Sequence, residues 1–185
     1  MTAVPAKPAR PPASVSFRYE PLPEDRQRVR EIVESTNFFS AAEVEVAVEL
    51  VDERLAKGEA SGYCFVFAEV EGRSVGYACY GPIPATAASY DLYWIAVHRQ
   101  CQGRQYGRLL LEESERLIRL AGGTRLYLDT SSRPQYQPTR AFYEHFDFRR
   151  AAVLDDFYAP GDGKVIYVKL VQAGMERFTA PAPNA

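Results

Sequence analysis

A polar turn with two glycines, residues 98–107, is the part of the chain whose residue types point most clearly to chemistry. It reads His-Arg-Gln-Cys-Gln-Gly-Arg-Gln-Tyr-Gly and separates an apolar run from an amphipathic segment. If that segment is helical, the turn leads into a helix N-terminus, where unpaired backbone N–H groups and the helix dipole favour a phosphate or pyrophosphate. Arg99, Arg104 and Arg108 would add positive charge. Many strand–turn–helix units carry glycines for geometry alone, so a turn without a ligand is the alternative.

This turn does not have the sequence of a nucleotide-binding loop. Neither G-x-x-x-x-G-K-[ST] nor G-x-G-x-x-G occurs in it, and the strands expected before it run as hairpins. The charge argues against nucleic acid as a partner, because 22 Lys+Arg and 24 Asp+Glu give a formal net charge of −2 and no broad basic field.

The cysteines and histidines do not form a recognisable metal site. Cys64, Cys79 and Cys101 are widely spaced and include no C-x-x-C pair, and the only histidines are His98 and His145. We therefore expect no bound metal. The chain also lacks a run of 18 apolar residues and a signal-like N-terminus, which predicts a cytoplasmic protein with no membrane partner.

Hydrophobic periodicity predicts the elements that must position the turn. Ser40 and Glu43 form a capping box for one helix, and Gly122 and Gly123 end another. We expect helices at 24–36, between Ser40 and Gly58, after Gly107 and at 138–146, and strands at 16–19, 62–70, 74–83, 89–97, 125–130, 148–154 and 164–170. One domain, 16–170, is predicted between a disordered Pro-rich arm, 1–15, and a flexible tail, 171–185.

The order of these elements, together with two sequence blocks, resembles the GNAT superfamily of acyl-CoA-dependent N-acyltransferases over residues 16–170. The blocks are Gln-Gly-Arg-Gln-Tyr-Gly-Arg at 102–108 and Arg-Ala-Phe-Tyr-Glu-His-Phe-Asp-Phe at 140–148. The resemblance implies an α+β fold in three layers: a mixed, mostly antiparallel sheet of about seven strands, flanked by about four helices and splayed between the fourth and fifth strands. It also implies acetyl-CoA as the acyl donor and no metal.

The resemblance assigns coenzyme binding to the turn and the strand before it. The family signature Q/R-x-x-G-x-G/A matches at Gln102 and Gly107, whereas Gln105 replaces its middle glycine. Tyr136 stands where the family often has an asparagine, and Asp147 stands in place of a glycine. The implied binding residues are Gln102, Gly103, Arg104, Gln105, Tyr106, Gly107 and Arg108 for the pyrophosphate, Ile95, Ala96 and Val97 for the pantetheine arm, and Tyr136.

Acyl transfer to an amine also needs a proton donor for the departing thiolate and an acceptor for the amine proton. The resemblance implies Tyr143 as the donor, with a core aromatic residue as the alternative. It places Asp91 or Tyr93 as the base or its water relay, and the main-chain N–H of Ile95 as the oxyanion donor. Strand alternation predicts Asp91, Tyr93, Ile95 and Val97 on one face, where partial burial would raise the pKa of Asp91. A solvated Asp91, or one paired with an arginine, is the alternative.

The acceptor groove is implied at Phe38-Phe39-Ser40 and in a loop at 155–162. Their aromatic and acidic residues would suit a small cation that bears an apolar group; the alternative is that the two segments only pack together. We expect an N-acetyltransferase that transfers acetyl from acetyl-CoA to a primary amine, on a small molecule or a peptide, by direct attack in a ternary complex. The sequence leaves open whether the protein forms a homodimer. The alternatives are a protein N-terminal or lysine acetyltransferase and a non-catalytic acyl-CoA-binding regulatory module.

Overall fold

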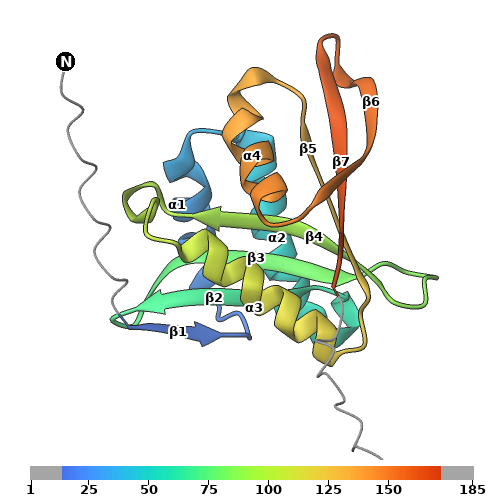
Figure 1. Cartoon of the computed structure of the whole chain (residues 1–185). Helices are drawn as coiled ribbons and strands as arrows, with labels where there is room; N and C mark the ends of the chain where they lie inside the picture. The colour runs from blue at the N-terminus through green and yellow to red at the C-terminus, as the bar shows by residue number, and fades with distance from the viewer. Residues whose placement is uncertain (1–13, 172–185) are drawn as a thin grey trace, which may run out of the picture.

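Seven strands form one sheet in the order β1-β2-β3-β4-β5-β7-β6 (Figure 1). The structure is a computed structural model that describes residues 14–171. The strands are β1 (Val15–Arg18), β2 (Cys64–Val70), β3 (Arg73–Pro82), β4 (Ser89–Val97), β5 (Arg125–Ser131), β6 (Arg149–Ala159) and β7 (Asp162–Leu170). The α-helices are α1 (Asp25–Thr36), α2 (Ala41–Lys57), α3 (Tyr106–Leu120) and α4 (Gln137–His145), and short 3-10 turns span Gly58–Ser61, Arg99–Cys101 and Pro134–Tyr136.

The limits of the folded domain differ slightly from the prediction. Val15 already belongs to β1, and Val171 is buried with its N–H donating to the Thr124 carbonyl at 2.9 Å. The rest of the predicted arm and tail, 1–13 and 172–185, lies outside the described residues.

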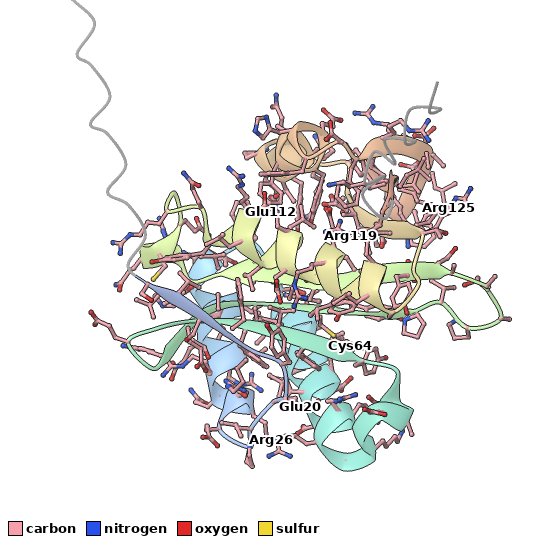
Figure 2. All side chains as sticks on the ribbon, turned by 60° about the horizontal axis from the view of Figure 1, so that its bottom comes forward. Glu20, Arg26, Cys64, Glu112, Arg119 and Arg125 are labelled. Carbon is pink, nitrogen blue, oxygen red and sulfur yellow. The ribbon has the colours of Figure 1, made fainter. Side chains whose placement is uncertain are left out.

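Helices cover both faces of the sheet and give the predicted three layers. Apolar residues of α1 and α2 fill one core against the sheet, and apolar residues of α3 and α4 fill a second core on the opposite face. Figure 2 shows side chains occupying both spaces, with α3 on one side of the strands and α1 and α2 on the other. The predicted capping box is present, because Ser40 Oγ accepts from the Glu43 N–H and Glu43 Oε2 accepts from the Ser40 N–H.

The sheet is mixed in the predicted way. Strand β4 runs parallel to β5, and every other neighbouring pair is antiparallel. The parallel pair is joined only from Ser89 opposite Arg125 to Asp91 opposite Tyr127. Beyond Asp91 no described strand pairs with this edge of β4, so the two strands diverge and leave an opening in the sheet.

A β-bulge in β4 overturns the predicted alternation of its side chains. Trp94 lies opposite Cys79 while Leu92 lies opposite Tyr80, so Tyr93 is one residue extra. Leu92 therefore shares the α3 face with Ile95 and Val97, where we had expected Asp91 and Tyr93. The bulge depends on the register with β3, which the β4 sequence does not reveal.

The prediction of a loop at 155–162 is also wrong for most of these residues. Strand β6 continues to Ala159, and Ala159 pairs with Asp162 across the short turn at Pro160 and Gly161. The pairing is irregular between Leu154 and Ala159, and Asp156 has a left-handed φ of 52°. This irregularity breaks the alternation that would have revealed a strand.

No helix among residues 14–171 is long and apolar enough to cross a membrane.

Candidate active site

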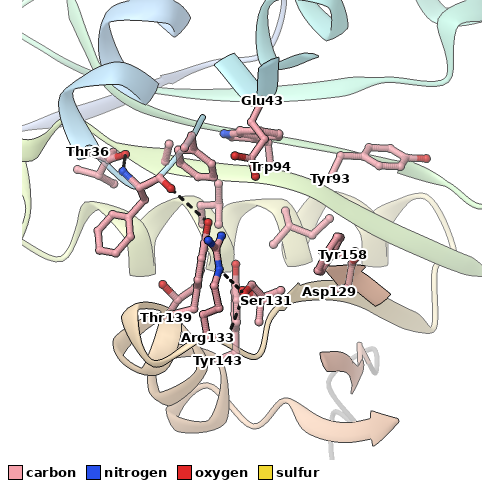
Figure 3. A pocket seen from close by; sticks show the side chains of 18 of the residues that line it. Thr36, Glu43, Tyr93, Trp94, Asp129, Ser131, Arg133, Thr139, Tyr143 and Tyr158 are labelled. Carbon is pink, nitrogen blue, oxygen red and sulfur yellow. Dashed lines mark hydrogen bonds between the residues drawn. The ribbon is translucent and has the colours of Figure 1, made fainter. Parts of the chain in front are cut away.

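A cavity of about 430 Å³ lies where β4 and β5 separate (Figure 3). One wall is the bulged part of β4, and the opposite wall is the end of β5 with the segment that leads into α4. The connection between α1 and α2 closes one side. The lining includes Phe38, Phe39, Glu43, Leu92, Tyr93, Trp94, Ile95, Ala96, Val97, Gln102, Asp129, Ser131, Arg133, Tyr136, Tyr143, Tyr158 and Asp162.

The glycine turn is attached directly to this cavity. Gln102 Nε2 donates to the Val97 carbonyl at 3.1 Å, which fixes the turn against the end of β4. The Nδ1 atom of His98 accepts from the Gln100 N–H at 3.3 Å. His98 therefore caps the short 3-10 turn at Arg99–Cys101. The turn's backbone amides then lead into the N-terminus of α3, an arrangement suited to an anion.

Two turn positions adopt the left-handed conformation, Gly103 with φ 73° and Gln105 with φ 68°. Gln105 is the N-cap of α3, and its side chain makes no capping hydrogen bond. A residue with a Cβ costs about 1–2 kcal/mol in this conformation, so Gln105 holds the turn at an energetic cost. Asp147, the other residue in place of a family glycine, has φ 64°, a conformation that aspartate adopts more readily than most residues.

Gly107 is not required by the packing of the chain itself. A Cβ built there would meet Phe142 at 3.7 Å and Val97 at 3.9 Å, both ordinary contacts. At Gly103, by contrast, a Cβ would meet no atom within 4 Å. Of the arginines near the turn, Arg108 is paired with Glu112 at 2.8 Å on the surface of α3, while Arg99 and Arg104 are exposed.

Tyr143 is a buried phenol that faces the cavity from α4. Its ring packs on Phe142, Phe148 and Tyr167, with centroid separations of 5.5, 5.6 and 6.1 Å. Burial raises the pKa of Tyr143 well above its ordinary value, and the negative charge of Asp129 raises it further. The phenol is thus part of the core, lies at the cavity wall and keeps its proton at neutral pH.

Asp91 lines a second cavity, of about 440 Å³, which lies beside the first. Tyr93 and Asp129 line both cavities and connect them. Burial raises the pKa of Asp91, Asp129 raises it further, and Lys164 lowers it. No arginine pairs with Asp91 among the described residues. Asp91 is therefore a half-buried carboxylate that faces open space, and Tyr93 links it to the cavity of Tyr143.

Tyr93 is poorly suited to be the base itself. Burial, with the nearby charge of Asp91, raises the pKa of Tyr93 to about 12. At neutral pH the phenol keeps its proton, so it can relay a proton but cannot start by accepting one.

The predicted acceptor segments do meet at the first cavity. Phe38 and Phe39 enter it from the α1–α2 connection, and Tyr158 and Asp162 enter it from the β6–β7 hairpin. The Phe39 ring lies 4.9 Å from that of Trp94. Tyr136 Oη donates to the Phe38 carbonyl at 3.3 Å, so Tyr136 helps to hold this wall in place.

Several polar residues of the cavity were not singled out from the sequence. Arg133 Nε pairs with Asp162 at 3.0 Å, and Ser131 Oγ bonds to the same carboxylate. Asp129 pairs with Lys164 at 2.7 Å and accepts from Tyr158 Oη at 3.1 Å. Glu43 was identified only as a helix cap. The one available signal was alternation along β5, which places Asp129 and Ser131 on the same face.

An opened sheet with a glycine turn at its edge is the geometry of an acyltransferase of the GNAT type, and the comparisons agree. Residues 26–148 match the model of the acetyltransferase (GNAT) family. A GNAT-family protein from Desulfovibrio desulfuricans is 51% identical with a TM-score of 0.84; the match covers 86% of this chain and 100% of that one. The chain therefore belongs to the GNAT family and is an acyltransferase.

Two more distant structures share the fold. An aminoglycoside 6'-N-acetyltransferase complexed with coenzyme A is 16% identical with a TM-score of 0.68, covering 86% of this chain and 98% of that one. The ribosomal-protein-S18-alanine N-acetyltransferase from Escherichia coli is 17% identical with a TM-score of 0.70, and the match covers 90% of this chain and 100% of that one. Comparison with the curated proteins gave no match.

Proposed function

We propose that this enzyme transfers an acetyl group from acetyl-CoA to a primary amine by direct attack in a ternary complex. The observation that carries the proposal is the opening beyond Asp91 and Tyr127, which leaves one edge of β4 unpaired next to the glycine turn. An extended pantetheine arm would lie along this edge of β4 at Ile95, Ala96 and Val97. The amides from Gln102 to Arg108 would then receive the pyrophosphate.

Acetyl-CoA supplies the activated acyl group, and the protein supplies alignment and proton transfer. The amine nitrogen forms a bond to the acetyl carbon while the carbon–sulfur bond breaks. The main-chain N–H of Ile95 would donate to the carbonyl oxygen as negative charge develops there. Asp91 would accept the amine proton through Tyr93 or a water, and its raised pKa makes it a stronger base than an ordinary aspartate. Tyr143 would donate to the departing sulfur.

The walls of the first cavity favour a small cationic amine that bears an apolar group. Its rings offer apolar and cation–π contacts, and its carboxylates outnumber its one lining arginine. Asp162 is balanced by Arg133 and Asp129 by Lys164, while no cation pairs with Glu43 among the described residues. Glu43 is therefore the carboxylate most available to a protonated substrate.

A panel of primary amines tests this proposal. Purified protein is mixed with acetyl-CoA and each amine, and both free coenzyme A thiol and the acetylated amine are measured. We expect thiol release that depends on the amine, with acetyl on nitrogen in the product, and a preference for small aromatic or aliphatic amines over lysine-containing and N-terminal peptides. Acetyl-CoA binding without turnover on any amine or peptide would instead support the regulatory-module alternative, in which Gln105 and Tyr136 mark a decayed site.

A further inference from the structure

Arg133 is the one arginine among residues 14–171 that lines the first cavity, and its side chain is 46% exposed. It reaches into the cavity beside Ser131 from the segment between β5 and α4 (Figure 3). Its Nε lies 3.0 Å from Asp162 Oδ2 and donates to Ser131 Oγ at 3.3 Å. Its backbone is held as well, because the N–H donates to Ser131 Oγ at 3.1 Å and the carbonyl accepts from Arg140 Nη1 at 3.0 Å. The guanidinium is therefore fixed from its Nε side.

The opposite edge of the guanidinium carries the two terminal nitrogens, Nη1 and Nη2. Asp162 is the only carboxylate that pairs with Arg133 among residues 14–171, and in this part of the chain neither terminal nitrogen donates a hydrogen bond of ordinary geometry. Its Cζ lies 5.6 Å from the centroid of the Tyr136 ring. A guanidinium stays charged at every working pH, and its terminal N–H groups match the two oxygens of a carboxylate. This edge is therefore arranged to bind an anion.

The neighbours of Arg133 favour the acceptor, and not coenzyme A, as the source of this anion. Asp162 begins β7 in the hairpin that closes one side of the proposed acceptor groove. Tyr136 holds Phe38, on the other side of that groove, through its hydroxyl. Arg133 therefore lies between two segments of the acceptor wall. The turn at 98–107, proposed for the coenzyme pyrophosphate, has arginines of its own.

We propose that the acceptor amine also carries a carboxylate, which Arg133 binds through Nη1 and Nη2; this rests on the proposed acetyl transfer and narrows its substrate class. Glu43 pairs with no cation among the described residues, so the cavity offers a carboxylate as well as a guanidinium edge. A ligand with both an ammonium group and a carboxylate complements the two. Because the walls are aromatic, amino acids with an aromatic or aliphatic chain fit best. Asp162 and Ser131 act as positioning residues, since they hold Nε.

Matched amines with and without a carboxylate test this substrate class on the unmodified protein. L-phenylalanine and phenethylamine differ only in the carboxylate, as do 6-aminohexanoate and pentylamine. In calorimetric titrations of the protein loaded with coenzyme A, at least one amino acid should bind about tenfold more tightly than its decarboxylated partner, as expected for hydrogen bonds between charged groups. Equal or weaker binding of both amino acids overturns the proposal, whether or not the amines are acetylated. Carboxylate-dependent binding without turnover of any amine supports it and contradicts the proposed acetyl transfer instead.

Substitution of Arg133 tests whether this residue binds the carboxylate. Arg133→Gln should abolish the preference for the amino acid, while the dissociation constant of acetyl-CoA stays within about twofold; Arg133→Lys, which keeps the charge but lacks the planar fork, should retain only part of the preference. Arg140→Gln is the matched control, because Arg140 supports the same wall through the Ser131 and Arg133 carbonyls but does not line the cavity. It should keep the preference. A preference that survives Arg133→Gln overturns the proposal, and so does a loss of affinity confined to acetyl-CoA, which would assign Arg133 to a coenzyme phosphate.

Discussion

Asp91 faces Tyr127 in the last residue pair that joins the parallel strands β4 and β5. This pair marks the point from which the sheet opens, and it places the candidate base at the closed end of the opening. The bulge at Tyr93 follows two residues later, so the phenol that links the two cavities lies directly beyond it. The same strand thus carries a proposed base, a relay and the backbone for the acyl arm.

Replacing Tyr143 by phenylalanine should lower kcat by about a hundredfold, at the lower end of the range for acid catalysis, because a phenol of raised pKa is a weak acid. The affinity for acetyl-CoA, measured by calorimetry, should stay within about twofold. Tyr167→Phe is the control, since Tyr167 is buried in the same core but bonds to Glu144 outside the cavity. Equal loss of binding and turnover in Tyr143→Phe would mark Tyr143 as a packing residue only.

The acid limb of the rate–pH profile should move in opposite directions in two variants. Asp91 must be ionised to accept a proton, so kcat/KM should fall as the pH drops through its raised pKa. Asp129→Asn removes a negative charge that raises this pKa and should shift the limb to lower pH, whereas Lys164→Met should shift it to higher pH. Asp91→Asn should abolish the limb together with most of the activity. Shifts in the same direction for both variants would exclude Asp91 as the titrating group.

Gln105→Gly should stabilise the protein, because it removes the strain of holding a residue with a Cβ in the left-handed conformation. The free energy of unfolding should rise by about 0.5–1 kcal/mol, once the greater freedom of glycine in the unfolded chain has been subtracted. This corresponds to an increase of about 2 °C in Tm. Arg104→Gly, at a neighbour without positive φ, should lower Tm by a similar amount. Thermal unfolding followed by circular dichroism measures both. An unchanged or lower Tm in Gln105→Gly would show that the turn is not strained there.

Glu43→Gln should raise KM for the amine about tenfold with little change in kcat. Glutamine can still complete the capping box with Ser40, so α2 should keep its start and only the negative charge is lost. The KM for acetyl-CoA and the Tm should stay unchanged. Steady-state kinetics with the best amine of the panel measures the effect, and an unaltered KM for that amine would assign cation recognition elsewhere in the cavity.

Local sequence signals predicted most of the fold. The bounds expected for β4 at 89–97 are those observed, and the box of Ser40 and Glu43 starts α2 as predicted. The predictions that were wrong concern features that depend on neighbouring strands. The bulge at Tyr93 is set by the register with β3, and the continuation of β6 depends on its pairing with β7.

The composition of the cavity was only partly predictable for the same reason. Phe38, Phe39, Tyr143 and Tyr158 fall on segments that could be assigned from the resemblance. Asp129 forms an ion pair with Lys164 on the adjacent strand, and its negative charge raises the pKa of Asp91 across the opening. Such a relationship exists only once β4, β5 and β7 are placed side by side.

Initial rates over a matrix of acetyl-CoA and amine concentrations test the central claim most directly. Direct attack in a ternary complex predicts double-reciprocal lines that intersect, with no acetyl group left on the protein when it is incubated with acetyl-CoA alone. Parallel lines, together with a protein mass increased by one acetyl group that the amine then removes, would contradict direct transfer.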